Sequence, residues 1–198
     1  MKRFFSTYTN ACKVADDFLF SLGDQDAINR ASLNSHVGKL TPTALYVHES
    51  ALEYLSPELR LYEGCARRYL GQVDDANIIK LKRHEPKVSY LSYPTFETDP
   101  HPALTSSVSV HLQTFRTNYR DYEDRENPPI LHRKELFIHE SHTLHGKVAR
   151  LTKAEEAKGL YEDTARIGLR QGWQEVLDDR GVMLKGHRVI RQTNEANP

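Results

Sequence analysis

The sequence predicts an α+β fold, in which a mostly antiparallel central sheet is flanked by N-terminal and C-terminal helices. Apolar residues recur at helical spacing in the first and last thirds of the chain, whereas period-two alternation marks the middle third. Helical and β patterns are thus segregated along the chain rather than alternating, which favours α+β over a parallel α/β arrangement.

The first third is predicted to be mainly helical. Gly23 suits the C-terminal cap of the first helix. Ser56 and Pro57 form a typical helix start, with a capping residue followed by proline in the first turn. The predicted elements are helices at 9–22, at 24–33 and from Ser56 to Gly71, and a short strand at 45–47.

The middle third alternates. Val108, Val110 and Leu112 would share one face of a strand, and 87–93 follows the same period. The predicted strands are 78–82, 87–93, 107–113 with a continuation through 115–119 past a bend, and 130–138.

The last third returns to helical patterns. Thr152–Glu155 matches a capping box, which predicts a helix from Thr152 to Gly159. A second helix is expected from Thr164 or Leu169 to Arg180, and a closing strand at 182–190. We expect one domain, 1–198, comprising a mainly helical part (1–72), a mainly β part (73–138), a helical hairpin with a closing strand (139–190) and a frayed tail (191–198).

Charge and composition narrow the function classes. The 198-residue chain holds 27 Lys and Arg against 27 Asp and Glu. A polyanion-binding protein is usually basic overall, so any nucleic-acid surface here must be local. Two cysteines, no apolar run of membrane-spanning length, and polar residues that interrupt the signal-like start at 1–5 predict a cytoplasmic protein without a membrane partner.

The chain has no G-x-G turn, and its nearest glycine motif, Glu63–Ala66, lies in a helical pattern. No S-adenosylmethionine site is therefore expected. His139, His142 and His145 are three residues apart, not four as in zinc proteases. They could line a helix and bind a metal, but a solvated surface segment is the favoured interpretation.

Two proline-fixed segments concentrate ionisable groups. Asp99-Pro-His101-Pro could hold an Asp/His pair rigidly, or could be a turn that caps a helix at 101–104. Asn127–Glu135 delivers His132, Arg133, Lys134 and Glu135, which suits either a phosphate site or a salt-bridged edge strand. Strand alternation would place His132 and Lys134 on one face.

Two basic segments could contact nucleic acid. Lys80, Lys82 and Lys87 lie beside tyrosines in a predicted hairpin. Basic and aromatic residues are combined in this way in proteins that bind single-stranded nucleic acid. At the C-terminus, Arg166 and Arg170 could belong to a helix-turn-helix-like pair, or to an ordinary helical hairpin with Trp173 in the core.

Several of these segments, in this order, resemble the DNA phosphorothioation-associated methyltransferase family over residues 36 to 190. They are Lys87–Pro94 (KVSYLSYP), Asp99–Leu104 (DPHPAL), Tyr119–Tyr122 (YRDY), Asn127–Glu135 (NPPILHRKE) and Gly186–Arg188 (GHR). The family's glycine-rich methyl-donor region has no counterpart in this chain. The resemblance implies a bacterial DNA modification, restriction or antiviral-defence context, without methyltransferase activity.

Three hypotheses follow. The leading one is a DNA-binding accessory module of a modification or phage-defence system, with Lys80, Lys82, Lys87, Arg120, His132, Arg133 and Lys134 on the DNA. The second is a nuclease in which Asp99, His101, Asp121 and Glu135 hold a divalent metal ion and Lys134 steadies the phosphate. The third is a subunit that docks onto a partner protein of the modification system.

Overall fold

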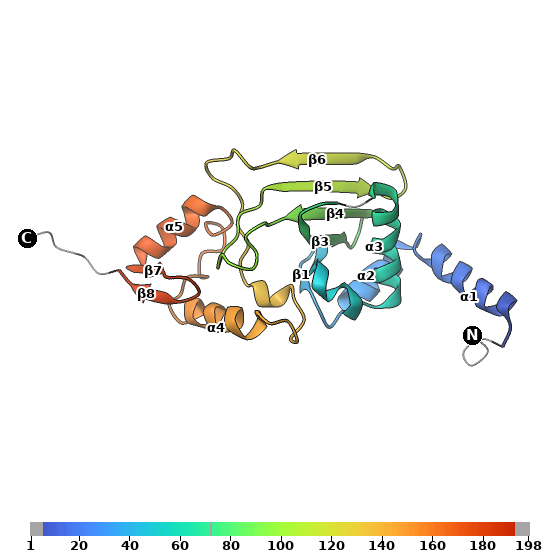
Figure 1. Cartoon of the computed structure of the whole chain (residues 1–198), viewed down its shortest axis with the longest axis horizontal. Coiled ribbons are helices and arrows are strands. Elements are labelled where there is room, and N and C mark those ends of the chain that lie inside the picture. Colours follow the sequence, from blue (N-terminus) through green and yellow to red (C-terminus); the bar gives the residue numbers. More distant parts are fainter. Residues whose placement is uncertain (1–5, 72, 193–198) are drawn as a thin grey trace, which may run out of the picture.

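A computed structural model describes residues 6–71 and 73–192. A six-stranded antiparallel sheet forms the centre, so the predicted α+β class is confirmed. The C-terminal helices lie at one end of the sheet, and the first helix projects beyond the other (Figure 1). Within the described ranges, every helix is too short or too polar to cross a membrane.

The N-terminal helices follow the predicted pattern. Helix α1, Tyr8–Ser21, begins where the Thr7 hydroxyl accepts the backbone N–H of Asn10. It buries none of its residues and extends away from the body of the protein (Figure 1). Helix α2 is Gln25–Leu33, and helix α3 is Pro57–Leu70. The short 3-10 helix η1, Glu49–Tyr54, precedes α3.

The sheet strands are ordered as in the sequence, β1 to β6, and every neighbouring pair is antiparallel. Residues 115–119 do not continue β5 past a bend, because the chain reverses near Phe115, which has a φ of 55°, and forms a separate edge strand. The strands are β1 Lys39–Leu40, β2 Ala44–His48, β3 Ala76–Lys82, β4 Lys87–Ser92, β5 Ser106–His111 and β6 Thr117–Asp121.

The two faces of the sheet differ. One face packs against α2 and α3 in the main core, where Ile79, Val88 and Tyr90 are buried with Leu59 of α3. On the other face, Ile78 packs into a second cluster with residues such as Phe96 and Phe137. The residues of β3 to β6 that continue this second face, from Lys80 to Arg120, are polar apart from Leu91.

The C-terminal third differs most from the sequence predictions. The predicted strand 130–138 is wrong, because only isolated bridges at Pro129 and Ile130 form before the 3-10 helix η2 begins. The predicted helix start at Thr152 is also wrong: the helix begins seven residues earlier, at His145. The elements are η2 Lys134–Leu136, α4 His145–Glu156, α5 Arg170–Asp179, β7 Val182–Leu184 and β8 Val189–Arg191.

The expected single closing strand at 182–190 is instead a two-stranded hairpin, β7–β8, with Gly186 at a positive φ of 54° in its turn. A third hydrophobic cluster, which includes Trp173 and Leu177 of α5, joins this hairpin to the helices. The signal-like start at 1–5 and most of the predicted frayed tail, 193–198, lie outside the described residues.

Candidate functional site

A buried polar network joins the sheet to the C-terminal helices. His101 Nε2 lies 2.7 Å from Glu155 Oε1, and the Tyr161 hydroxyl donates to Glu155 Oε2 at 2.6 Å. His101 Nδ1 is 3.2 Å from the carbonyl oxygen of Leu131, so both ring nitrogens face oxygen acceptors. Glu155 is completely buried and His101 nearly so. The network is therefore closed to a substrate in this conformation.

His132 and Trp173 extend this network. The His132 ring lies 4.4 Å from that of His101 and 4.6 Å from that of Trp173, centroid to centroid. His132 Nε2–H donates to the carbonyl oxygen of Ile167 at 2.7 Å, while its buried Nδ1 has no partner among the described residues. Burial, reinforced by His101, lowers the pKa of His132 to about 3, so this ring is neutral at pH 7.

The buried side chain of Lys134 bonds to the backbone of the turn that contains Asp99. Its ammonium donates to the carbonyl oxygens of Phe96 and Asp99, both at 2.6 Å. Burial lowers the pKa of Lys134 to about 8. The Asp99 carboxylate accepts the His101 backbone N–H at 2.9 Å, so it fixes the turn rather than the imidazole. The alternative that Asp99 caps a helix at 101–104 is wrong, because those residues form no helix and Ala103 instead forms an isolated bridge with Ile130.

Arg133 breaks the predicted alternation. Its φ of 56° and ψ of 53° are left-handed, so 132–135 is not a strand with alternating faces. Arg133 points to Glu156, at 2.7 Å, and Glu135 accepts from the Thr152 hydroxyl at 2.8 Å. His132 and Lys134 are both buried, so in this conformation their predicted contact with a DNA backbone does not form.

The structure does not bring together the four residues predicted to bind a metal ion, Asp99, His101, Asp121 and Glu135. Asp121 lies on the edge strand β6, whereas Glu135 contacts α4. Across residues 6–71 and 73–192, no three His, Cys, Asp or Glu side chains are placed to bind one metal ion. The stretch from His139 to Leu144 precedes α4, so the three histidines do not line one helix. His139 instead stacks on Tyr54, with centroids 3.7 Å apart.

The second face of the sheet carries four of the basic residues predicted from the sequence to bind nucleic acid. Directly opposed residues on neighbouring strands share a face, and so do residues two apart on one strand. The register therefore places Lys80, Lys82, Lys87 and Arg120 on this second face. One cross-strand row runs over it. The row is Lys39, Tyr46, Lys80, Ser89, Ser109 and Asn118.

Lys39 is a candidate that the sequence reasoning missed, because only the β1–β2 register brings it into this row. The Lys80 ammonium lies 4.9 Å from the centre of the Tyr46 ring, and Lys39 lies 5.4 Å from that of Phe137. Of the five cations, Lys82 alone has a described carboxylate within 4.0 Å, at 3.7 Å from Glu85. We call Lys39, Lys80, Lys82, Lys87 and Arg120 the basic face.

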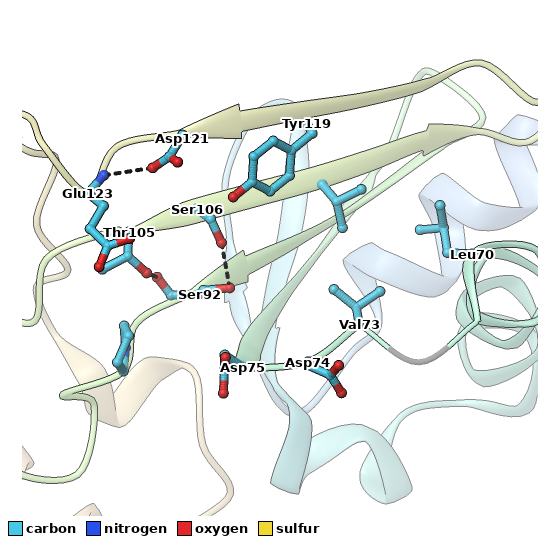
Figure 2. A pocket seen from close by; sticks show the side chains of 12 residues that line it. Leu70, Val73, Asp74, Asp75, Ser92, Thr105, Ser106, Tyr119, Asp121 and Glu123 are labelled. Carbon is cyan, nitrogen blue, oxygen red and sulfur yellow. Dashed lines mark hydrogen bonds between the residues drawn. The ribbon is translucent and has the colours of Figure 1, made fainter.

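The first face of the sheet, opposite the basic face, is acidic at its β6 edge. A hollow of about 530 Å³ opens between β6 and the segment before β3, and Asp74, Asp75, Asp121 and Glu123 line it. Figure 2 shows these carboxylates around Ser92 and Ser106, whose hydroxyls are hydrogen-bonded at 3.0 Å. This acidic hollow would repel a polyanion.

The predicted helix-turn-helix arrangement is not supported by the described contacts. Arg166 forms ion pairs with Glu175, at 3.1 Å, and Asp179, at 2.9 Å, along α5. Its charge is therefore neutralised within the protein. Trp173 is buried, as predicted for a core residue. Glu63–Ala66 lies inside α3, so it forms no phosphate-binding turn.

No protein-family model matches this chain, and neither a curated protein nor a solved structure shows significant similarity to it.

Proposed function

We propose that this chain is a DNA-binding module whose sheet contacts the phosphate backbone through the basic face. The observation that carries this proposal is the register, which brings Lys39, Lys80, Lys82, Lys87 and Arg120 to one polar face. Basic side chains that contact phosphates supply most of the sequence-independent affinity of DNA-binding proteins.

The distribution of charge supports this assignment despite the zero net charge of the chain. The cations of the basic face lie on one side of the sheet, and the carboxylates of the acidic hollow lie on the other side at the β6 edge, so the basic face suits a polyanion better. Ser89, Ser109 and Asn118 in the same row offer hydroxyl and amide groups that can bond phosphate oxygens. The Lys80 ammonium lies over the ring of Tyr46, 4.9 Å from its centre, and this cation–π contact holds the charge on the basic face.

The accessory role in a DNA modification or phage-defence system rests on the family resemblance of residues 36 to 190. Under this proposal the chain holds DNA for a separate enzyme and performs no methyl transfer itself. The buried His101, His132 and Lys134 maintain the fold that positions the sheet relative to the C-terminal helices.

The deciding experiment is a salt series of binding to matched duplex and single-stranded DNA, each with and without phosphorothioate, in Mg²⁺ and then in chelator. The test variant is Lys80→Gln/Lys82→Gln/Lys87→Gln. Its charge-matched control replaces three exposed lysines elsewhere, Lys13, Lys153 and Lys158, by Gln. Removal of one phosphate-binding cation should reduce the slope of log K against log salt by about 0.9 for duplex or about 0.7 for single strands.

The proposal requires a shallower slope in the test variant and an unchanged slope in the control. Equal losses of affinity in both variants would show that only the overall charge matters, and would refute the assigned face. If no DNA binds, the remaining hypothesis is a subunit that docks onto a partner protein. Metal-dependent cleavage would show a nuclease whose metal ligands are arranged differently from those described above.

A further inference from the structure

A second basic surface lies outside the six-stranded sheet, between α4 and the β7–β8 hairpin. It encloses a hollow of about 630 Å³, which we call the basic hollow. Lys147, Arg150, Lys185 and Arg188 line it with His187, and none of its described lining residues is acidic. Ala154, Val189 and Ile190 provide an apolar wall.

Some arginines of the C-terminal third are paired with carboxylates, and several other basic residues there are not. Arg166 and Arg180 are paired with carboxylates, namely Glu175, Asp179 and Glu162. By contrast, the four cations of the basic hollow have no carboxylate of residues 6–71 and 73–192 within 4.0 Å. Four unneutralised cations that converge on one concavity repel each other, which an anionic ligand would relieve.

Arg150 and Arg188 give the hollow directional donors as well as charge. Their planar guanidinium groups favour bidentate hydrogen bonds to phosphate oxygens, whereas Lys147 and Lys185 contribute point charges. The imidazole of His187 is part of the lining, but its buried Nε2 atom is inaccessible from the hollow.

We propose that the basic hollow binds a phosphate ester of more than one negative charge, such as a nucleotide or the phosphorylated end of a nucleic acid. Arg150 and Lys147 from α4 and Lys185 and Arg188 from the hairpin would hold the phosphate. The volume exceeds that of a single phosphate and accommodates a nucleoside-sized group against the apolar wall. The site shares no residue with the basic face.

Calorimetric titration with inorganic pyrophosphate, AMP and ATP tests the site directly. Titration with an oligonucleotide that carries either a 5′-phosphate or a 5′-hydroxyl then separates the two sources of phosphate. The test variants are Arg150→Gln and Lys185→Gln. The control is Lys153→Gln, which removes an exposed charge on the same helix but outside the hollow.

We expect pyrophosphate to bind, each test variant to weaken it by about tenfold, and the control to leave it unchanged. The Lys80→Gln/Lys82→Gln/Lys87→Gln variant should also bind pyrophosphate normally, so this inference can fail or succeed independently of the DNA-binding proposal. Tighter binding of the 5′-phosphorylated oligonucleotide would identify a nucleic-acid end, and tighter binding of a free nucleotide would identify a small ligand. Absence of heat with every phosphate, or an equal weakening in Lys153→Gln, would overturn the inference.

Discussion

The imidazole of His101 and the carboxylate of Glu155 are in contact at 2.7 Å although 54 residues separate them in the chain. His101 belongs to the loop that follows β4, and Glu155 to the last turn of α4. With Tyr161 as its second partner, Glu155 is a fully buried carboxylate whose two oxygens are both bonded. This contact ties the helical end of the protein to the sheet.

Replacing Glu155 by Gln should destabilise the protein by about 2 kcal/mol, because an amide donor replaces one of the two buried acceptor oxygens that bond His101 and Tyr161. The neighbouring Glu156→Gln should cost under about 1 kcal/mol, since its ion pair with Arg133 is half-exposed. Urea unfolding of both variants measures the difference. Equal costs would show that the buried network contributes no more than a surface ion pair.

Replacing Lys134 by Met should leave the carbonyl oxygens of Phe96 and Asp99 without their donor. Each unsatisfied buried group costs about 1–3 kcal/mol, so the variant should unfold at lower urea concentration. Lys153→Met is the exposed control on α4. A Lys134→Met protein as stable as the unmodified chain would mean that solvent replaces the ammonium at no cost.

Stability should fall on acidification, in part through His132. Burial holds the pKa of His132 at about 3 in the folded protein, below the ordinary value of 6.5. Between these values the unfolded chain binds a proton that the folded protein does not, so a decrease in pH favours unfolding.

His132 alone should contribute a slope that approaches about 1.4 kcal/mol per pH unit between pH 6.5 and the folded-state pKa of about 3. The measurement is the unfolding free energy at several pH values for the unmodified protein and for His132→Gln. The His132→Gln variant should be less stable than the unmodified protein at pH 7, and its unfolding free energy should decrease less steeply as the pH is lowered. Parallel curves would mean that this ring titrates normally.

Glycine substitutions should have opposite effects at the closely packed start of α5 and in the open middle of α3. A Cβ at Gly172 would lie 2.1 Å from the carbonyl oxygen of Arg166, so Gly172→Ala must displace the start of α5. At Gly64, within α3, a Cβ meets nothing within 4 Å. Gly64→Ala should therefore stabilise by about 0.5–1 kcal/mol, whereas Gly172→Ala should lower the thermal midpoint. Equal midpoints would contradict the close approach at Gly172.

Much of the fold could be predicted because its signals are local. The three N-terminal helices and strands β2 to β5 follow periodicity and recognisable ends, such as Ser56-Pro57 and Gly71. The segment after Ile130 misled the prediction because its residue types suit a strand. Its actual path depends on the left-handed Arg133, which alternation cannot reveal. Likewise Thr152–Glu155 resembles a helix start although it lies near a helix end.

The candidate sites depend on information that is not local. The chain shows basic residues at 80, 82, 87 and 120, but only strand register shows that they share a face and that Lys39 joins them. The burial of Lys134 has no sequence signal, because a lysine is ordinarily exposed. The basic hollow also requires the hairpin turn at Gly186, in a segment whose residue pattern predicts one continuous strand.

Arg120 and Asp121 are consecutive residues, yet they belong to opposite faces of the edge strand β6. Because the net charge of the chain is zero, a distant polyanion exerts little net attraction on it. The separation of charge between the two faces nevertheless produces a torque in the field of the polyanion. Such a molecule would rotate during approach and present one side first. The association rate with DNA would then exceed the rate expected for randomly oriented collisions. Added salt would lower this rate, because it screens the field that orients the protein.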